Sequence, residues 1–223
     1  MIAREPTLAR LATAEQLLLE PFGLTTAHLH QALAEIDALP GRHLYFLDDH
    51  LFADERFVRA LLTELRGAGR IFQAAGTVRS ILRPGLMELA AEAGLRSLFV
   101  GFESLRAENL AAHGKHHGPP AEYERAIGHL HGLGVMINAS FVFGMDADDE
   151  RVFDATVDWA VAQGLETATF HVLTPYPGTA LFARLEREGA SCTAAGTSTT
   201  RATPCFGRRG WRRTSWSAAP TEP

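Results

Sequence analysis

The segment Ser97-Leu98-Phe99-Val100-Gly101-Phe102-Glu103-Ser104 decides the expected fold of this chain. Its first six residues are nearly all apolar, which is typical of a parallel strand that helices cover on both faces. A glutamate and a serine follow directly. A carboxylate at the end of a buried strand needs a polar partner or a ligand, so the segment predicts both a core strand and a candidate site residue, Glu103.

The same pattern recurs on both sides of this segment. Apolar runs predict strands at 43–47, 71–75, 97–102, 135–143 and 167–173, and a 3.6-residue spacing between them predicts helices at 26–39, 54–65, 84–93, 122–133, 150–163 and 179–188. Pro84 suits a helix start. Gly67, Gly94, Gly134 and Gly164 each follow a helix and precede a strand, as left-handed helix caps do.

Strands that alternate with helices predict an α/β fold, either a β/α barrel or a doubly wound sheet. An eight-fold barrel needs about 250 residues, so a partial barrel over residues 25–188 is the better prediction. Residues 1–24 match neither pattern. Residues 189–223 contain no Leu, Ile or Val, cannot form a core element, and are expected to be a disordered tail.

Composition excludes several classes of protein. The 223 residues carry a net charge of −5, which is not expected of a nucleic-acid binder. Hydrophobic residues make up 46% of the chain, which is enough for a core. We expect no membrane span and no secretory signal, and therefore a cytoplasmic protein. The two cysteines, Cys192 and Cys205, have no metal-site spacing.

Polar residues follow or interrupt the predicted strands where ligands of β/α folds bind, at the carboxyl ends. Asp48 and Asp49 follow the first strand, and one of them could simply cap the next turn or helix. Asn138 and Ser140 lie in the fourth strand. His171, in the fifth, could equally be a core histidine.

Four motifs in order resemble one known family. They are Phe46-Leu47-Asp48-Asp49-His50-Leu51-Phe52, Phe99-Val100-Gly101-Phe102-Glu103-Ser104 followed by Glu108-Asn109-Leu110, Ser140-Phe141-Val142-Phe143-Gly144, and Leu173-Thr174-Pro175-Tyr176-Pro177-Gly178-Thr179. Over residues 25–188 the chain resembles the radical S-adenosylmethionine (SAM) enzymes that carry a cobalamin-binding domain.

The resemblance implies a partial TIM-like (β/α)6 barrel, of which this chain would supply strands two to six. It also implies reductive SAM cleavage by a 4Fe-4S cluster and cobalamin-dependent methyl transfer. By analogy, Glu103 and Ser104 would contact the ribose and amino-acid parts of SAM. Asp48 and Asp49 would line the SAM or substrate side, and Asn138, Ser140 and Val142 would lie beside the adenosine.

The sequence departs from the family in its cysteines. The family holds its cluster with a C-x3-C-x2-C loop, and this sequence has no cysteine before Cys192. Because such clusters need thiolate ligands, the cluster is not expected to bind this chain. The family's cobalamin-binding domain also has no counterpart among these residues, so cobalamin is not expected to bind either, and the chain is predicted to be inactive alone. Back-translation of the tail in a shifted frame allows the segment WDLYDTRH, similar to a family motif, so we interpret residues 189–223 as a frameshift.

Two other functions are compatible with the sequence. Asp48, Asp49, Glu103 and His171 could hold a divalent metal in an unrelated barrel enzyme. Alternatively, the chain could be a non-catalytic module that binds SAM or a partner. The sequence names no substrate. Without a strand before 43–47, an apolar sheet edge would be exposed, which predicts self-association.

Overall fold

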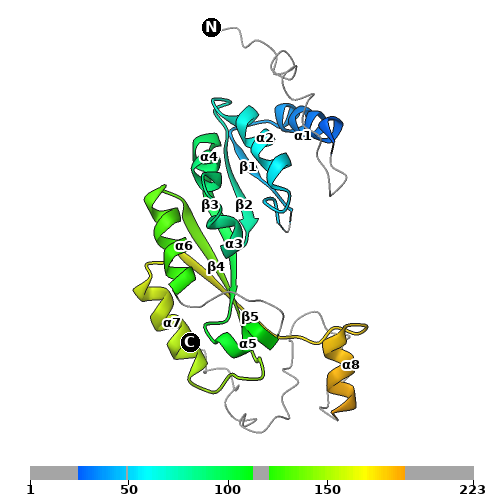
Figure 1. Ribbon diagram of the computed structural model, residues 1–223, viewed down its shortest axis with the longest axis vertical. Helices are drawn as coiled ribbons and strands as arrows, with labels where there is room; N and C mark the ends of the chain where they lie inside the picture. The colour runs from blue at the N-terminus through cyan, green and yellow to red at the C-terminus, as the bar shows by residue number, and fades with distance from the viewer. Residues whose placement is uncertain (1–24, 49, 113–120, 189–223) are drawn as a thin grey trace, which may run out of the picture. The chain divides into compact units, whose positions relative to one another are not determined.

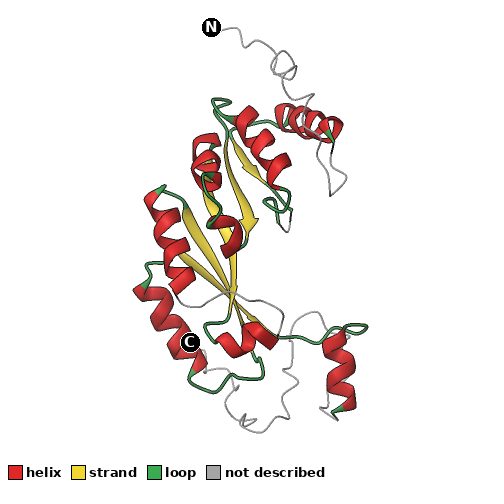
Figure 2. Ribbon diagram, viewed as in Figure 1, coloured by secondary structure: helices red, strands yellow, loops and turns green. Residues whose placement is uncertain are grey.

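The computed structural model describes residues 25–48, 50–112 and 121–188. In these residues helices and strands alternate along the chain (Figure 1, Figure 2). The strands are β1 (His43–Tyr45), β2 (Ile71–Gly76), β3 (Leu95–Glu103), β4 (Met136–Phe143) and β5 (Thr167–Val172). The helices are α1 (Thr26–Ala38), α2 (Glu55–Leu65), α3 (Val78–Ile81), α4 (Leu86–Ala93), α5 (Ala107–Ala112), α6 (Ala121–Gly132), α7 (Val152–Ala162) and α8 (Ala180–Arg187).

The strands form one sheet in the order β1-β2-β3-β4-β5, so each strand pairs with its neighbours in sequence. The β1–β2 and β2–β3 pairings are parallel, as the continuous apolar runs predicted. Phe72 pairs with Leu95 but Gln73 pairs with Ser97, so Arg96 is an extra residue in β3. This bulge resets the alternation of side chains, so that Leu95 and Leu98 are both fully buried although three positions separate them.

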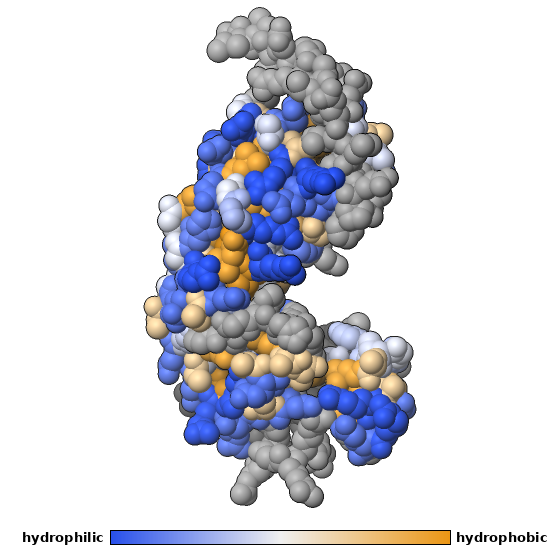
Figure 3. Space-filling model, viewed as in Figure 1, coloured by the Kyte–Doolittle hydropathy of each residue, from blue (hydrophilic) through white to orange (hydrophobic). Residues whose placement is uncertain are grey.

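Contacts divide the described residues into two compact units. The first comprises 25–48, 50–102, 121–139 and 165–167, and the second comprises 103–112, 140–164 and 168–188. The chain passes from the first to the second unit after Phe102, within β3, and again after Ala139, within β4. Both units present apolar residues among hydrophilic ones at the surface (Figure 3).

The first unit is built on amphipathic helices that cover the β1–β3 part of the sheet. Helix α2 buries Val58, Leu61, Leu62 and Leu65, a spacing of three, four and seven residues that places all four on one face. Asp54 begins this helix, and its carboxylate accepts a 2.9 Å hydrogen bond from the amide of Phe57. Helix α2 packs against α1 and α4.

Most predicted elements are present, with some differences at their ends. Gly67, Gly94, Gly134 and Gly164 all have positive φ, which confirms their predicted role as left-handed caps. Pro84 is not the first residue of a helix: α4 begins at Leu86 after Gly85. The short helices α3 and α5 were not predicted, because four and six residues are too few to show a helical period.

Three sequence predictions concern residues outside this description. Residues 1–24, Asp49 and the proposed frameshifted tail at 189–223 all lie outside the described ranges. Within those ranges, no helix has both the length and the apolar character needed to cross a bilayer.

Candidate functional site at the ends of β3 and β4

Glu103, the last residue of β3, has an unusual backbone conformation. Its φ is +66°, and it is the single non-glycine residue of the described part of the chain with a positive φ. In this region the Cβ of an L-residue crowds its own backbone, at a cost of about 1–2 kcal/mol. Such strain persists where the surroundings enforce it, and it is often found at ligand sites. Glu103 is half-buried, so its carboxylate is not simply a solvated surface group.

Ser104 is held in place by two hydrogen bonds to its side chain. Its side chain is buried, and Oγ accepts from the amide of Arg106 at 3.1 Å and from Nδ2 of Asn109 at 3.2 Å. Asn109 lies on α5 and is only 1% exposed. The serine therefore turns the chain from β3 into α5 and has a structural role, whatever ligand contact it makes in addition.

Asn109 also binds the loop that follows β4. Its Nδ2 donates a 2.7 Å hydrogen bond to Oδ1 of Asp148, and its Oδ1 accepts from the amide of Ala147 at 2.9 Å. Oδ2 of Asp148 accepts from the amides of Gly144 and Met145 at 2.8 and 3.0 Å. Both carboxylate oxygens of this buried side chain are thus satisfied, as burial of a charge requires.

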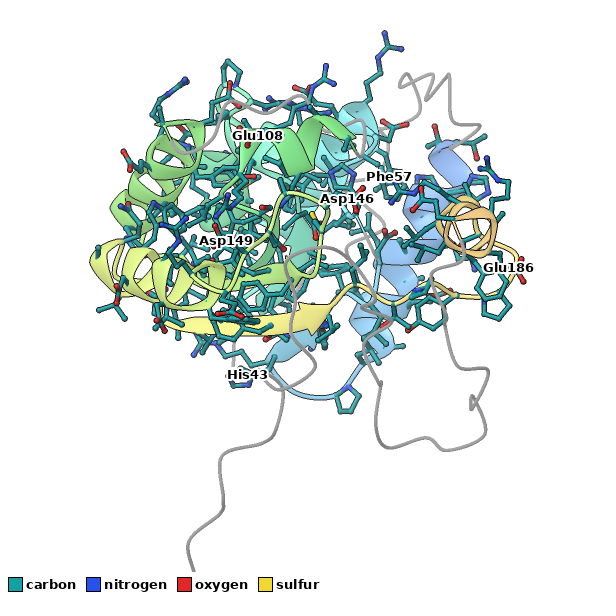
Figure 4. All side chains as sticks on the ribbon, turned by 90° about the horizontal axis from the view of Figure 1, so that it is seen from below. His43, Phe57, Glu108, Asp146, Asp149 and Glu186 are labelled. Atoms are coloured by element: carbon teal, nitrogen blue, oxygen red, sulfur yellow. The ribbon has the colours of Figure 1, made fainter. Side chains whose placement is uncertain are left out.

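A second, exposed contact links the same two segments. Oδ2 of Asp149 lies 3.0 Å from a guanidinium nitrogen of Arg106 and 3.0 Å from a guanidinium nitrogen of Arg151. These interactions, with Arg151 the main contributor, lower the pKa of Asp149 to about 2. Asp146, which lies with Asp149 on the segment after β4 (Figure 4), pairs with Arg184 at 3.1 Å. Exposed pairs of this kind add little stability.

Three predicted site residues share one face of β4. Asn138, Ser140 and Val142 alternate with Ala139, Phe141 and Phe143, so strand geometry directs them to the face opposite those three buried residues. Phe141 and Phe143 contact Trp159 and Phe153 of α7 edge to face. Within the second unit, the side of β4 that carries Ser140 and Val142 is therefore the one turned away from α7.

Asp48 has a local role in the first unit. It is exposed, and its Oδ1 accepts a 2.8 Å hydrogen bond from the amide of His50. This is the turn-capping alternative that the sequence left open, whereas the cap of helix α2 is Asp54. Asp49 lies outside the described residues, so the paired acids are not seen together.

His171 is exposed, so it is not the core histidine that the sequence left open. It lines a pocket of about 320 Å³ in the second unit together with Phe143, Phe153, Val157, Phe170 and Val172. Within the described ranges, no three His, Cys, Asp or Glu side chains come together as metal ligands would.

The structure thus brings Glu103, Ser104, Ser140 and Val142 into the second unit, while Asp48 and Asn138 belong to the first. The sequence interpretation missed Asp148. This residue stands in an acidic run, Asp146-Ala147-Asp148-Asp149-Glu150, in which nothing local distinguishes the buried carboxylate from the solvated ones.

Solved structures share this fold. The radical S-adenosylmethionine methyltransferase TsrM from Kitasatospora setae, with cobalamin and a 4Fe-4S cluster bound, matches 81% of this chain and 36% of its own, with a TM-score of 0.61 and 21% identity. Coproporphyrinogen III oxidase from Escherichia coli, a radical SAM enzyme, matches 74% of this chain and 42% of its own, with a TM-score of 0.53 and 14% identity. These likenesses confirm the predicted α/β fold class, a partial radical SAM barrel.

Curated proteins are similar in sequence as well. Bacteriochlorophyllide d C-12(1)-methyltransferase from Chlorobaculum tepidum is 30% identical over 141 residues, which are 63% of this chain and 31% of that protein. Hopanoid C-2 methylase from Rhodopseudomonas palustris is 26% identical over 152 residues, 66% of this chain and 29% of that protein. No family model matches. The resemblance to cobalamin-type radical SAM methyltransferases is confirmed, and the chain spans about a third of the length of these relatives.

Proposed function

We propose that this chain is the SAM-binding part of the barrel of a cobalamin-dependent radical SAM methyltransferase. The observation that carries the proposal is Glu103: a half-buried acid at the carboxyl end of a core strand, in a backbone conformation that costs free energy. The similarity to methyltransferases over most of the described residues supports methyl transfer as the reaction of the whole enzyme.

The donors and acceptors in the second unit suit SAM. SAM offers ribose hydroxyls and an ammonium group, and the Glu103 carboxylate is a strong acceptor for both. Ser140 and Val142, on one face of β4, offer a hydroxyl and an apolar surface, which suit the polar edge and the ring face of an adenine. We infer that Glu103 binds the ribose or the amino group, and that β4 flanks the adenosine.

The residues present do not fit the 4Fe-4S cluster that such enzymes use. A 4Fe-4S cluster needs thiolate ligands, and the two cysteines of this sequence, Cys192 and Cys205, have the wrong spacing for the C-x3-C-x2-C loop. The 223-residue chain is therefore expected to bind SAM without cleaving it.

Isothermal titration of the chain with SAM tests the proposal. We expect saturable binding that E103Q weakens about tenfold, because a hydrogen bond to a charged group is replaced by a neutral one. The matched control is E108Q, which removes an equal charge from an exposed glutamate five residues away, on α5 (Figure 4), and should leave affinity unchanged. Absence of saturable binding, or equal loss in both variants, would overturn the proposal.

The metal-dependent enzyme and the non-catalytic module, the two alternatives, predict different results in binding and activity measurements. A metal-dependent barrel enzyme would show tight Mg²⁺ or Mn²⁺ binding that E103Q abolishes, and no described cluster of ligands favours this outcome. A non-catalytic SAM-binding module would bind SAM equally well. In that case, even a longer form of the protein would not catalyse SAM cleavage or methyl transfer. The protein encoded by the complete coding region can be reconstituted with iron, sulfide and cobalamin. Its catalytic activity then separates that case from the proposed enzyme.

A further inference from the structure

Two loops of the second unit meet at one buried pair of side chains. We call residues 103–106 the β3 loop and residues 144–149 the β4 loop. Asn109 donates to Ser104 of the β3 loop, and it both donates to Asp148 and accepts from the amide of Ala147 in the β4 loop. Asn109 and Asp148 are 1% and 8% exposed, so water does not replace these bonds easily.

The pair forms a buried connection between these loops. A further contact between the loops, Arg106 to Asp149, lies at the surface, with both side chains more than a third exposed. Solvent and salt screen such a pair, whereas the buried amide–carboxylate contact is unscreened and costly to break. The Asp148 carboxylate additionally fixes the β4 loop through the amides of Gly144 and Met145.

The β3 loop begins at the residue with the strained backbone. Glu103 adopts its φ of +66° immediately before Ser104, whose hydroxyl is tied to Asn109. Left-handed backbone in a glutamate relaxes unless neighbouring residues hold it. The nearest anchoring side chain on its C-terminal side is Ser104, and Ser104 is anchored through Asn109 to Asp148.

We propose that Asn109 and Asp148 form a positioning pair that holds the β3 loop against the β4 loop and keeps Glu103 in its left-handed, ligand-ready conformation. Neither residue touches the ligand in this proposal. The inference rests on the proposed SAM site for its consequence in binding, but the coupling of the two loops is a property of the chain alone and is measurable without any ligand.

An exchange of the two side chains tests the pair specifically. N109D alone replaces the donating amide, so that its new carboxylate faces the carboxylate of Asp148. D148N alone replaces the accepting carboxylate oxygen with an amide nitrogen, so that two N–H donors face each other. In the double variant N109D/D148N, the carboxylate introduced on α5 is expected to accept from the amide of Ala147 and from the new side-chain amide of the β4 loop. The carbonyl oxygen of that side-chain amide still accepts from the amides of Gly144 and Met145. The Ser104 hydroxyl can rotate to donate to the introduced carboxylate, so every bond of the network can re-form.

Hydrogen exchange of the backbone amides of both loops is the first readout. Each single variant is expected to speed exchange at residues 103–106 and 144–148 by about tenfold or more, equivalent to losing one net hydrogen bond of about 1.4 kcal/mol, while the double variant returns to near the wild-type rate. Unchanged exchange in the single variants would overturn the proposal. So would a double variant no better than the worse single one. If the single variants do not fold, a double variant that folds supports the pair and one that also fails overturns it.

SAM affinity is the second readout and separates this inference from the proposed function. If the wild-type chain binds SAM, both single variants should weaken binding at temperatures where they remain folded, and the double variant should restore it. E103G supplies a further check, because glycine takes positive φ freely and should make loop exchange less sensitive to D148N. A chain that binds no SAM but shows the loop coupling would refute the proposed function and leave the positioning pair standing.

Discussion

The hydroxyl of Tyr123 donates a 2.6 Å hydrogen bond to the backbone carbonyl of Phe102, and the two rings meet edge to face with centroids 4.8 Å apart. Tyr123 lies on α6 and is 1% exposed. Phe102 is the residue directly before Glu103, at the end of β3. A buried tyrosine thus secures the strand end on one side of the strained residue, while Ser104 secures the other side.

Removing this hydroxyl should destabilise the first unit without changing its packing. Y123F leaves the carbonyl of Phe102 with one bond fewer in a buried site, so we expect a loss of about 1–2 kcal/mol in the free energy of unfolding by urea titration. Y45F is the matched control, since Tyr45 is 59% exposed and should change stability by less than about 0.5 kcal/mol. Equal losses in the two variants would contradict the role given to Tyr123.

Two glycine caps are expected to differ in their tolerance of alanine. Gly94 has a φ of +116°, and an added Cβ would collide with the backbone carbonyl of Arg70. Gly134 has a φ of +68° and open space around it. G134A should cost about 1 kcal/mol of stability through backbone strain, whereas G94A should cost several times more or prevent folding. Thermal melts of both variants measure the difference, and similar melting temperatures would refute it.

The first unit should lose stability in mild acid through His50. Burial, reinforced by the Arg83 guanidinium, lowers the pKa of His50, although the Asp48 carboxylate opposes this. Below the ordinary value of about 6.5 the unfolded chain binds the proton more readily than the folded chain, so stability falls as pH decreases through that range. H50Q should therefore show a smaller drop in melting temperature between about pH 7.5 and about pH 5.5.

A second variant checks the sign of this effect. D48N removes the charge that raises the pKa of His50, so the acid-induced drop should become larger than in the wild-type chain. The same drop in the wild type, H50Q and D48N would mean that His50 does not contribute.

The edge of the sheet at β1 is expected to cause self-association. Among the described strands β1 pairs only with β2, and Tyr45 and Leu47 are 59% and 84% exposed beside it. Light scattering after size exclusion should find concentration-dependent oligomers that L47K reduces. V161K, at a 74% exposed position on α7, is the control and should leave association unchanged. A monodisperse monomer at all concentrations would exclude this edge as an interface.

The frameshift interpretation is tested at the level of DNA. Sequencing the gene and its flanks should reveal WDLYDTRH in the shifted frame over the region that encodes residues 189–223, together with a C-x3-C-x2-C loop upstream. Coding DNA without the shifted segment would refute the interpretation.

Much of the fold was predictable from local pattern. The apolar run that includes Leu98 and Val100 predicted a buried strand, and the glycines after each helix predicted left-handed caps, because both depend on a few neighbouring residues. The bulge at Arg96 was not predictable in this way. It depends on which residue of β2 each residue of β3 meets, and that pairing is set by the sheet.

The features of the candidate site likewise fall into those that local sequence sets and those that tertiary packing sets. By itself the sequence determined that Glu103 and Ser104 follow the apolar part of a core strand and that Asn138 and Ser140 lie in another strand, since apolar runs are local properties. Only the tertiary structure decided that Glu103 has a left-handed backbone, and that Asp148 alone of its acidic run is buried against Asn109. The physical reason is that burial and hydrogen bonding between residues 39 positions apart depend on how distant segments pack, which no spacing in the sequence records.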